Sequence, residues 1–254
     1  MYKRQLEDEA AVTCAPYLKL LRTGKPWVIA KWAMTMDGRI ATTAGESQWI
    51  TGEAARADVH HLRSRVDGIA VGMGTVITDD PMLNARSSDP SASPARIATR
   101  LVFCRHRLPP ENSRLVTTAS QIPLTLVIGR DLLSRGEARQ QLDRLRILGA
   151  NVIETNTDDE VQMVRAALLQ MGALRMTNVM VEGGGELIAS FFSAGQIDEC
   201  HVYIGPLAFG GRDAPGPIGG AGIARLPDSP RFQIMSLEQI QDDVKVVYRC
   251  SESP

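Results

Sequence analysis

Short apolar segments alternate with amphipathic segments along most of the chain, and this order constrains the fold more than any other feature. Strands alternating with helices favour a mostly parallel sheet with helices on both faces. The last apolar segments follow one another without a helix, which predicts an antiparallel edge. The apolar segments that read as strands lie at residues 25–34, 67–72, 99–104, 123–129, 151–154, 177–182, 198–206, 232–237 and 244–250.

The segments between them carry helical spacing. In residues 51–66 the apolar side chains Ala55, Val59, Leu62 and Val66 recur every three or four positions, and Thr51 is placed to cap the helix. Residues 131–148, 158–172 and 186–194 read as three more helices. The chain therefore predicts one α/β domain over residues 25–254, with residues 1–24 as an N-terminal extension.

Composition excludes several classes of protein. The net charge of −1 over 254 residues gives no general attraction to nucleic acid or to a membrane surface. No apolar run is long enough to cross a membrane, and the N-terminus lacks the apolar core of a secretory signal. The cysteines at 14, 104, 200 and 250 have no C-x-x-C spacing, so we expect free thiols in the cytoplasm and no metal site.

Two glycine-rich strand ends are suited to phosphate binding. Residues 181–190, VEGGGELIAS, read as strand, glycine turn and helix, and unpaired N–H groups at a helix start attract phosphate. Residues 71–81, VGMGTVITDDP, repeat the pattern, with Thr75 as a cap and Asp79 late in a short helix. A tight turn without a ligand explains either stretch equally well.

Arginines supply a third signal. Arg56 and Arg63 lie seven residues apart on the polar face of the first helix, Arg86 follows the second glycine segment, and Arg105 and Arg107 follow a strand in the sequence CRHR. Each alone is typical of a solvated surface. Together with two glycine turns they indicate a cleft for a phosphorylated ligand beyond the carboxyl ends of parallel strands.

Familiar catalytic motifs are missing. The four histidines do not start H-x-E or H-E-x-x-H, which disfavours zinc deaminase and zinc protease chemistry. The sequence has no G-x-S-x-G elbow and no G-x-x-x-x-G-K-[ST] loop, which disfavours serine hydrolases and P-loop nucleotide hydrolases.

Three stretches, in this order, carry a family resemblance: KWAMTMDGRIATTAGESQWITGEAARADVHHLR (31–63), GMGTVITDDPMLNAR (72–86) and VEGGGELIASFF (181–192). They resemble the reductase domain of bacterial riboflavin-biosynthesis deaminase/reductases, from about Pro26 to the C-terminus. The resemblance implies a dihydrofolate-reductase-like α/β fold. It also implies NADPH-dependent reduction of 5-amino-6-(5-phosphoribosylamino)uracil to the ribitylamino compound, and a homodimer. The deaminase half is missing from this chain, and CAPYLKLLRTG (14–24) resembles the connector that follows the deaminase in the bifunctional proteins. The resemblance therefore implies either a free-standing reductase, for which a separate deaminase is a candidate partner, or a fragment cut at the connector.

The resemblance also assigns residues. It implies that Lys31, Ser47, Arg63, Leu83, Arg86 and Glu182 contact the substrate. For the cofactor it implies Ala33, Trp49, Thr75, Asp79, Arg105, Gly183, Gly184, Gly185, Glu186 and Leu187. Trp49 can equally be a core residue, and Asp37 at the Asp-Gly turn reads as turn chemistry.

The expected chemistry is hydride transfer to an imine-like carbon, which the protein promotes by positioning and by charge. Glu182, Asp79 and Lys31 are the candidate catalytic groups, and the sequence does not choose the proton donor, since ordered water serves as well. Two alternatives remain open: a reductase of the same fold acting on another substrate such as a pteridine, and a non-catalytic module that accompanies a separate deaminase.

Overall fold

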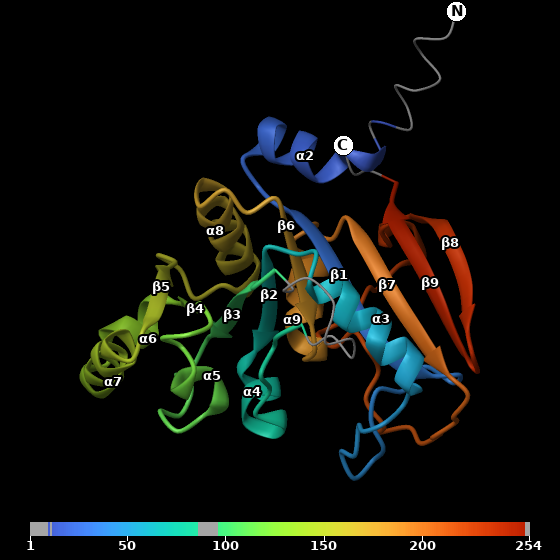
Figure 1. The fold of residues 1–254 in the computed structure, drawn as a ribbon, viewed down its shortest axis with the longest axis horizontal. Helices are drawn as coiled ribbons and strands as arrows, with labels where there is room; N and C mark the ends of the chain where they lie inside the picture. The colour runs from blue at the N-terminus through green and yellow to red at the C-terminus, as the bar shows by residue number, and fades with distance from the viewer. Residues whose placement is uncertain (1–9, 11, 86–95, 252–254) are drawn as a thin grey trace, which may run out of the picture.

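The fold is built on one twisted sheet with helices on both faces (Figure 1). The structure is a computed structural model and describes residues 10, 12–85 and 96–251. Within this part the strands lie in the order β5-β4-β3-β2-β6-β1-β7-β9-β8. Their bounds are β1 (Trp27–Thr35), β2 (Gly68–Gly72), β3 (Thr99–Cys104), β4 (Leu124–Ile128), β5 (Ala150–Glu154), β6 (Asn178–Glu182), β7 (Glu199–Gly205), β8 (Phe232–Ile240) and β9 (Asp243–Cys250).

Pairing in the sheet follows the expected pattern. Every neighbouring pair from β5 across to β7 is parallel, whereas β9 runs antiparallel to β7 and β8 antiparallel to β9. The parallel strands β2, β3, β4 and β6 are mostly apolar and almost wholly buried, as expected of strands covered on both faces. The predicted fold class, a mostly parallel α/β sheet with an antiparallel edge, is confirmed.

Helices cover the sheet on two sides. Leu115 and Leu142 belong to the same buried cluster as Ile69 on one face, while Leu168 and Phe191 belong to the cluster of Val179 on the other. The first face carries α3 (Glu53–Arg63), α4 (Met73–Asp79), α5 (Arg114–Thr117), α6 (Arg130–Ser134) and α7 (Gly136–Ile147). The second carries α8 (Glu160–Ala173) and α9 (Gly185–Ser193).

Four details of the predicted helices are wrong. The N-cap of α3 is Gly52 rather than Thr51, and the helix ends at Arg63, so Val66 lies beyond it in the core. Thr75 is not a cap, because Gly72 caps α4 and Thr75 lies inside the helix. The segment 131–148 is two helices, since Arg135 between them adopts an extended backbone with ψ 119°.

The N-terminal extension contains a helix that periodicity did not predict, α2 (Ala15–Thr23). It packs so closely on α8 that the carbonyl oxygen of Gly24 lies 1.9 Å from where a Cβ at Gly172 would stand. The Lys19 ammonium is buried and lies 2.5 Å from the Asp198 carboxylate, which also accepts from the backbone N–H of Val28. An ion pair thus joins the extension to the start of β7.

No helix in the described part of the chain has both the length and the apolar character needed to cross a membrane.

Candidate functional site

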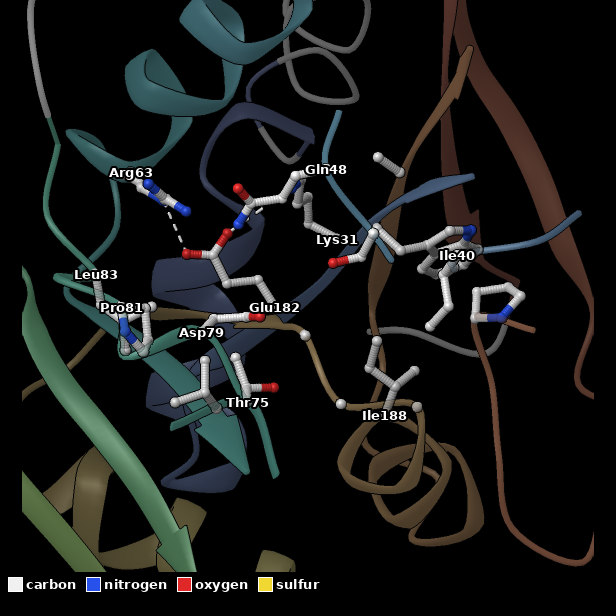
Figure 2. Close-up of a pocket in the computed structure, with 18 of the residues that line it drawn as sticks. Lys31, Ile40, Gln48, Arg63, Thr75, Asp79, Pro81, Leu83, Glu182 and Ile188 are labelled. Carbon is white, nitrogen blue, oxygen red and sulfur yellow. Dashed lines mark hydrogen bonds and ion pairs between the residues drawn. The ribbon is translucent and has the colours of Figure 1, made fainter. Parts of the chain in front are cut away.

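A cavity of about 550 Å³ lies where the carboxyl ends of β1, β2 and β6 meet (Figure 2). Parallel strands bring their carboxyl ends to one edge, so residues far apart in the chain face the same space. Register pairing sets Lys31 beside Glu182 on adjacent strands. The lining residues are Lys31, Trp32, Ala33, Ile40, Ser47, Gln48, Trp49, Arg63, Val71, Thr75, Asp79, Pro81, Met82, Leu83, Arg114, Glu182, Gly183, Gly184, Gly185, Ile188 and Pro217.

Glu182 is a buried carboxylate held between two cations. Arg63 Nε donates to its Oε1 at 2.8 Å, and Lys31 Nζ lies 3.8 Å from its Oε2. Figure 2 shows Arg63 and Glu182 pointing toward one another across the cavity wall. Burial by itself raises the pKa of Glu182, but the charges of Arg63 and Lys31 outweigh burial, so this pKa is lowered. Glu182 is therefore an anion near neutral pH.

Lys31 lies close to Glu182 and also to a second polar group, the hydrogen-bonded pair Tyr203–Asp58. Burial lowers the pKa of Lys31, and the neighbouring Glu182 partly opposes that shift. The ammonium also lies 5.9 Å from the ring centroid of Tyr203, whose hydroxyl donates to Asp58 at 2.6 Å. The Lys31 side chain is thereby held with its three N–H donors near the cavity, where it can donate to a ligand carbonyl.

Asp79 is the second acid on the cavity wall. It is the last residue of α4, and the partial burial of its carboxyl raises its pKa. No cation is paired with it in the described part of the chain. The pKa values of the two acids in the cavity wall are thus shifted in opposite directions: that of Glu182 is lowered, which favours the anion, and that of Asp79 is raised, which favours the protonated form.

The glycine turn between β6 and α9 is closely packed against α4. Gly183 and Gly184 have φ of 78° and 77°, which disfavour other residues. A Cβ on Gly183 would lie 3.1 Å from the Thr75 hydroxyl, and one on Gly184 would lie 3.3 Å from it. Helix α9 begins at Gly185 without a side-chain cap, so its first N–H groups are available to an anion such as a pyrophosphate.

A second cavity, of about 390 Å³, adjoins the glycine turn. Gly184 and Gly185 line both. The other lining residues of the second cavity are Gly72, Met73, Gly74, Phe103, Arg105, His106, Arg107, Glu160, Met163, Val164, Glu186, Leu187 and Ser190. An elongated ligand can therefore occupy both cavities with its middle at the start of α9.

Trp49 forms an exposed part of the first cavity wall and is not a core residue. Its side chain is 65% exposed, and the Arg56 guanidinium stacks 4.4 Å from its ring centroid. Asp37 lies outside both cavities, where its carboxylate accepts from the Thr35 hydroxyl and from the backbone N–H of Gly210. These hydrogen bonds lower the pKa of Asp37 to about 2 and tie its turn to the loop after β7.

Comparison with known proteins decides the family. Residues 26–246 match the family described as the RibD C-terminal domain. The chain belongs to this family. The resemblance inferred from the sequence is thereby confirmed.

Curated relatives and solved structures agree with this assignment. The chain is 33% identical over 243 residues to the riboflavin biosynthesis protein RibD of Actinobacillus pleuropneumoniae, covering 96% of this chain and 62% of the relative. It is 34% identical over 226 residues to the 2,5-diamino-6-ribosylamino-4(3H)-pyrimidinone 5′-phosphate reductase of Methanothermobacter thermautotrophicus, covering 88% and 98% respectively. Acinetobacter baumannii RibD superposes with a TM-score of 0.80 at 27% identity, covering 97% of this chain and 64% of that one. The chain thus spans about three-fifths of the RibD relatives it matches.

The structure brings together nearly all the residues that the RibD-like resemblance assigned. The first cavity is lined by Lys31, Ala33, Ser47, Trp49, Arg63, Thr75, Asp79, Leu83 and Glu182, together with Gly183, Gly184 and Gly185. The second is lined by Arg105, Glu186 and Leu187. Arg86 lies outside the described residues. The part that each residue plays toward a ligand stays a prediction.

Arg114 is the lining residue that sequence reasoning missed most clearly. It starts the four-residue helix α5, which is too short to show a periodicity, and its backbone N–H donates to Asp80 at 2.8 Å. The side chain lines the same cavity as Arg63. Its position in the same cavity wall as Arg63 follows from packing of the segment after β3 against the end of α4, which no local sequence pattern predicts.

Within residues 10, 12–85 and 96–251, no group of three or more histidine, cysteine or acidic side chains is arranged to hold a metal ion.

Proposed function

We propose that this chain is an NADPH-dependent reductase of 5-amino-6-(5-phosphoribosylamino)uracil that forms the ribitylamino product in riboflavin biosynthesis. The observation that carries the proposal is the Glu182 carboxylate, held by Arg63 and Lys31 directly before the glycine turn. The names of the relatives, a riboflavin biosynthesis protein and a ribosylaminopyrimidinone phosphate reductase, support the same reaction class.

The two cavities fit a dinucleotide. The uncapped start of α9 and the close approach permitted by Gly183 and Gly184 suit the pyrophosphate. Ala33 and Trp49 would line the nicotinamide side, and Arg105 in the second cavity would face the adenosine side. NADPH, when bound, supplies the hydride, and the protein supplies orientation and charge.

Glu182 and Lys31 would act directly on the substrate. The Glu182 carboxylate accepts from ribose hydroxyls and stabilises positive charge as the imine-like carbon develops. The Lys31 ammonium donates to a pyrimidine carbonyl. Arg63 and Arg114 add positive charge on the same wall for a substrate phosphate. Arg63 therefore has two tasks, since it also neutralises Glu182.

The pKa directions divide the two acids between roles. The pKa of Glu182 is lowered and its carboxylate stays ionised, so it serves as an electrostatic group and does not donate the proton. The pKa of Asp79 is raised and its side chain lines the same cavity, which makes it the better candidate among the side chains for the proton donor. Water on the open side of the cavity is the other source of a proton.

The direct test is oxidation of NADPH with 5-amino-6-(5-phosphoribosylamino)uracil, followed at the nicotinamide absorbance. Turnover that needs this substrate, and is absent with a dihydropteridine, supports the proposal. Turnover of the pteridine alone would point to a different reductase of this fold. No turnover with either, from a chain that binds NADPH, would favour a non-catalytic module beside a separate deaminase.

The cofactor preference gives a separate expected result. Because Arg105 and Arg107 line the second cavity, a 2′-phosphate meets cations there, and kcat/KM should be higher for NADPH than for NADH. Steady-state rates with each cofactor at saturating substrate measure this ratio. Equal kcat/KM values would contradict the assignment of the arginines.

We also propose a homodimer through the antiparallel edge. Strand β8 is the outer strand of the sheet, and its side chains Ile234, Met235 and Leu237 are 60%, 44% and 68% exposed. An apolar edge strand of this kind favours pairing with another chain. Light scattering at micromolar concentration should give twice the chain mass of 27.6 kDa, and Leu237→Lys should lower it. A monomeric mass for the unaltered chain would count against the dimer.

A further inference from the structure

An ion pair lies in the wall of the second cavity. Arg105, which follows β3, pairs with Glu160, the first residue of α8. The other carboxylate oxygen of Glu160 lies 3.0 Å from the Ser190 hydroxyl on α9. Three elements from separate parts of the chain therefore meet around one carboxylate, and all three side chains line the cavity.

The position of this pair follows from the proposed cofactor path. Gly184 and Gly185 line both cavities, so a pyrophosphate at the start of α9 directs the nicotinamide half toward Ala33 and the adenosine half toward Arg105. The adenosine ribose then lies next to the Arg105–Glu160 pair. This step rests on the proposed function.

The two members of the pair have opposite preferences for a ribose. A carboxylate accepts a hydrogen bond from a ribose 2′-hydroxyl, the group that NADH presents, and repels a 2′-phosphate. A guanidinium binds the 2′-phosphate of NADPH. While Glu160 accepts from Arg105, that guanidinium is partly neutralised, and a phosphate must compete with the carboxylate for it.

We propose that Glu160 sets the discrimination between NADPH and NADH by competing with the 2′-phosphate for Arg105. The carboxylate limits the preference for NADPH and leaves the site able to accept NADH. Both side chains are about half exposed, at 49% for Arg105 and 40% for Glu160, so water screens the pair and its exchange for a ligand phosphate costs little.

The test measures nucleotide binding alone, so it does not depend on turnover. Calorimetry gives the dissociation constants of adenosine 2′,5′-bisphosphate and of 5′-AMP for the unaltered chain and for Glu160→Gln. Glutamine keeps the size of the side chain and a hydrogen-bond acceptor for Ser190, but removes the charge. We expect the ratio of the two affinities to shift toward the bisphosphate by about tenfold, the scale of one charge-assisted hydrogen bond that the phosphate gains from the freed Arg105 guanidinium.

Two further variants separate the possible causes. Glu111→Gln breaks another exposed arginine–glutamate pair, with Arg144 at 2.7 Å and similar exposure, and lies outside both cavities, so the affinity ratio should not change. In an Arg105→Met background, the shift in affinity ratio caused by Glu160→Gln should largely disappear, because Glu160 then has no Arg105 guanidinium to pair with.

Each outcome bears on one claim. An affinity ratio unchanged in Glu160→Gln, with both nucleotides bound, overturns the role of Glu160 and leaves the proposed reductase intact. A full tenfold shift that persists in the Arg105→Met background overturns competition for that guanidinium. Failure of the unaltered chain to bind either nucleotide overturns the cofactor path, and the proposed function falls with this inference.

Discussion

Glu182→Gln should reduce kcat by about 10²-fold or more, which is the scale of losing one electrostatic group at a reacting centre. Glutamine keeps the size of the side chain and can still accept from Arg63, but it carries no charge to stabilise a cationic imine. The affinity for NADPH should change little, because the glycine turn is untouched. Single-turnover rates at saturating substrate, with NADPH titrated by fluorescence, measure both quantities.

A matched control tests whether this loss comes from chemistry or from folding. Glu199 on β7 is also a carboxylate with two side-chain partners, since His201 lies 2.6 Å and Arg249 3.1 Å from its oxygens, but it lines neither cavity. Glu199→Gln should lower stability without a comparable fall in kcat. Near-normal turnover in Glu182→Gln would disprove its electrostatic role, and a selective loss of NADPH binding would place Glu182 in the cofactor site.

Lys19→Met should lower the free energy of unfolding by about 3–5 kcal/mol, because it leaves the buried Asp198 carboxylate without its ammonium partner. The side chains are only 7% and 5% exposed, so water does not replace the lost contact. Urea denaturation followed by circular dichroism measures the change.

Lys25→Met is the control for this second variant. Lys25 follows α2 and donates to the Gln196 amide oxygen at 3.1 Å. Because its partner is neutral, replacing Lys25 does not deprive a buried carboxylate of its cation. We expect a loss of less than about 1 kcal/mol, typical of a partly exposed polar contact. If Lys19→Met lowered the free energy of unfolding no more than Lys25→Met does, helix α2 would contribute little to the stability of the domain.

Much of the fold and of the site could be predicted from the sequence, because those features depend on local patterns. Apolar runs such as residues 27–35 and 178–182 become strands since no other element buries them equally well. The turn at Gly183 and Gly184 was predicted because only glycine tolerates its backbone at low cost. The order of these elements was enough to place Glu182 and the glycine turn at the end of a strand, whereas Lys31 lies within β1.

Pairings between distant residues were decided by the tertiary structure alone. Glu182 meets Arg63 across 119 positions, and Arg105 meets Glu160 across 55, so no spacing rule relates them. The boundary of α3 and the break at Arg135 also escaped prediction, since tertiary packing overrides weak local propensity at helix ends. The sequence by itself determined where the strands, the glycine turn and most of the helices lie, because short-range sterics and apolar periodicity act locally. Only the folded sheet decided which charges face each other, and thus the direction in which the pKa of each acid shifts, because electrostatic energy depends on distance and burial in space.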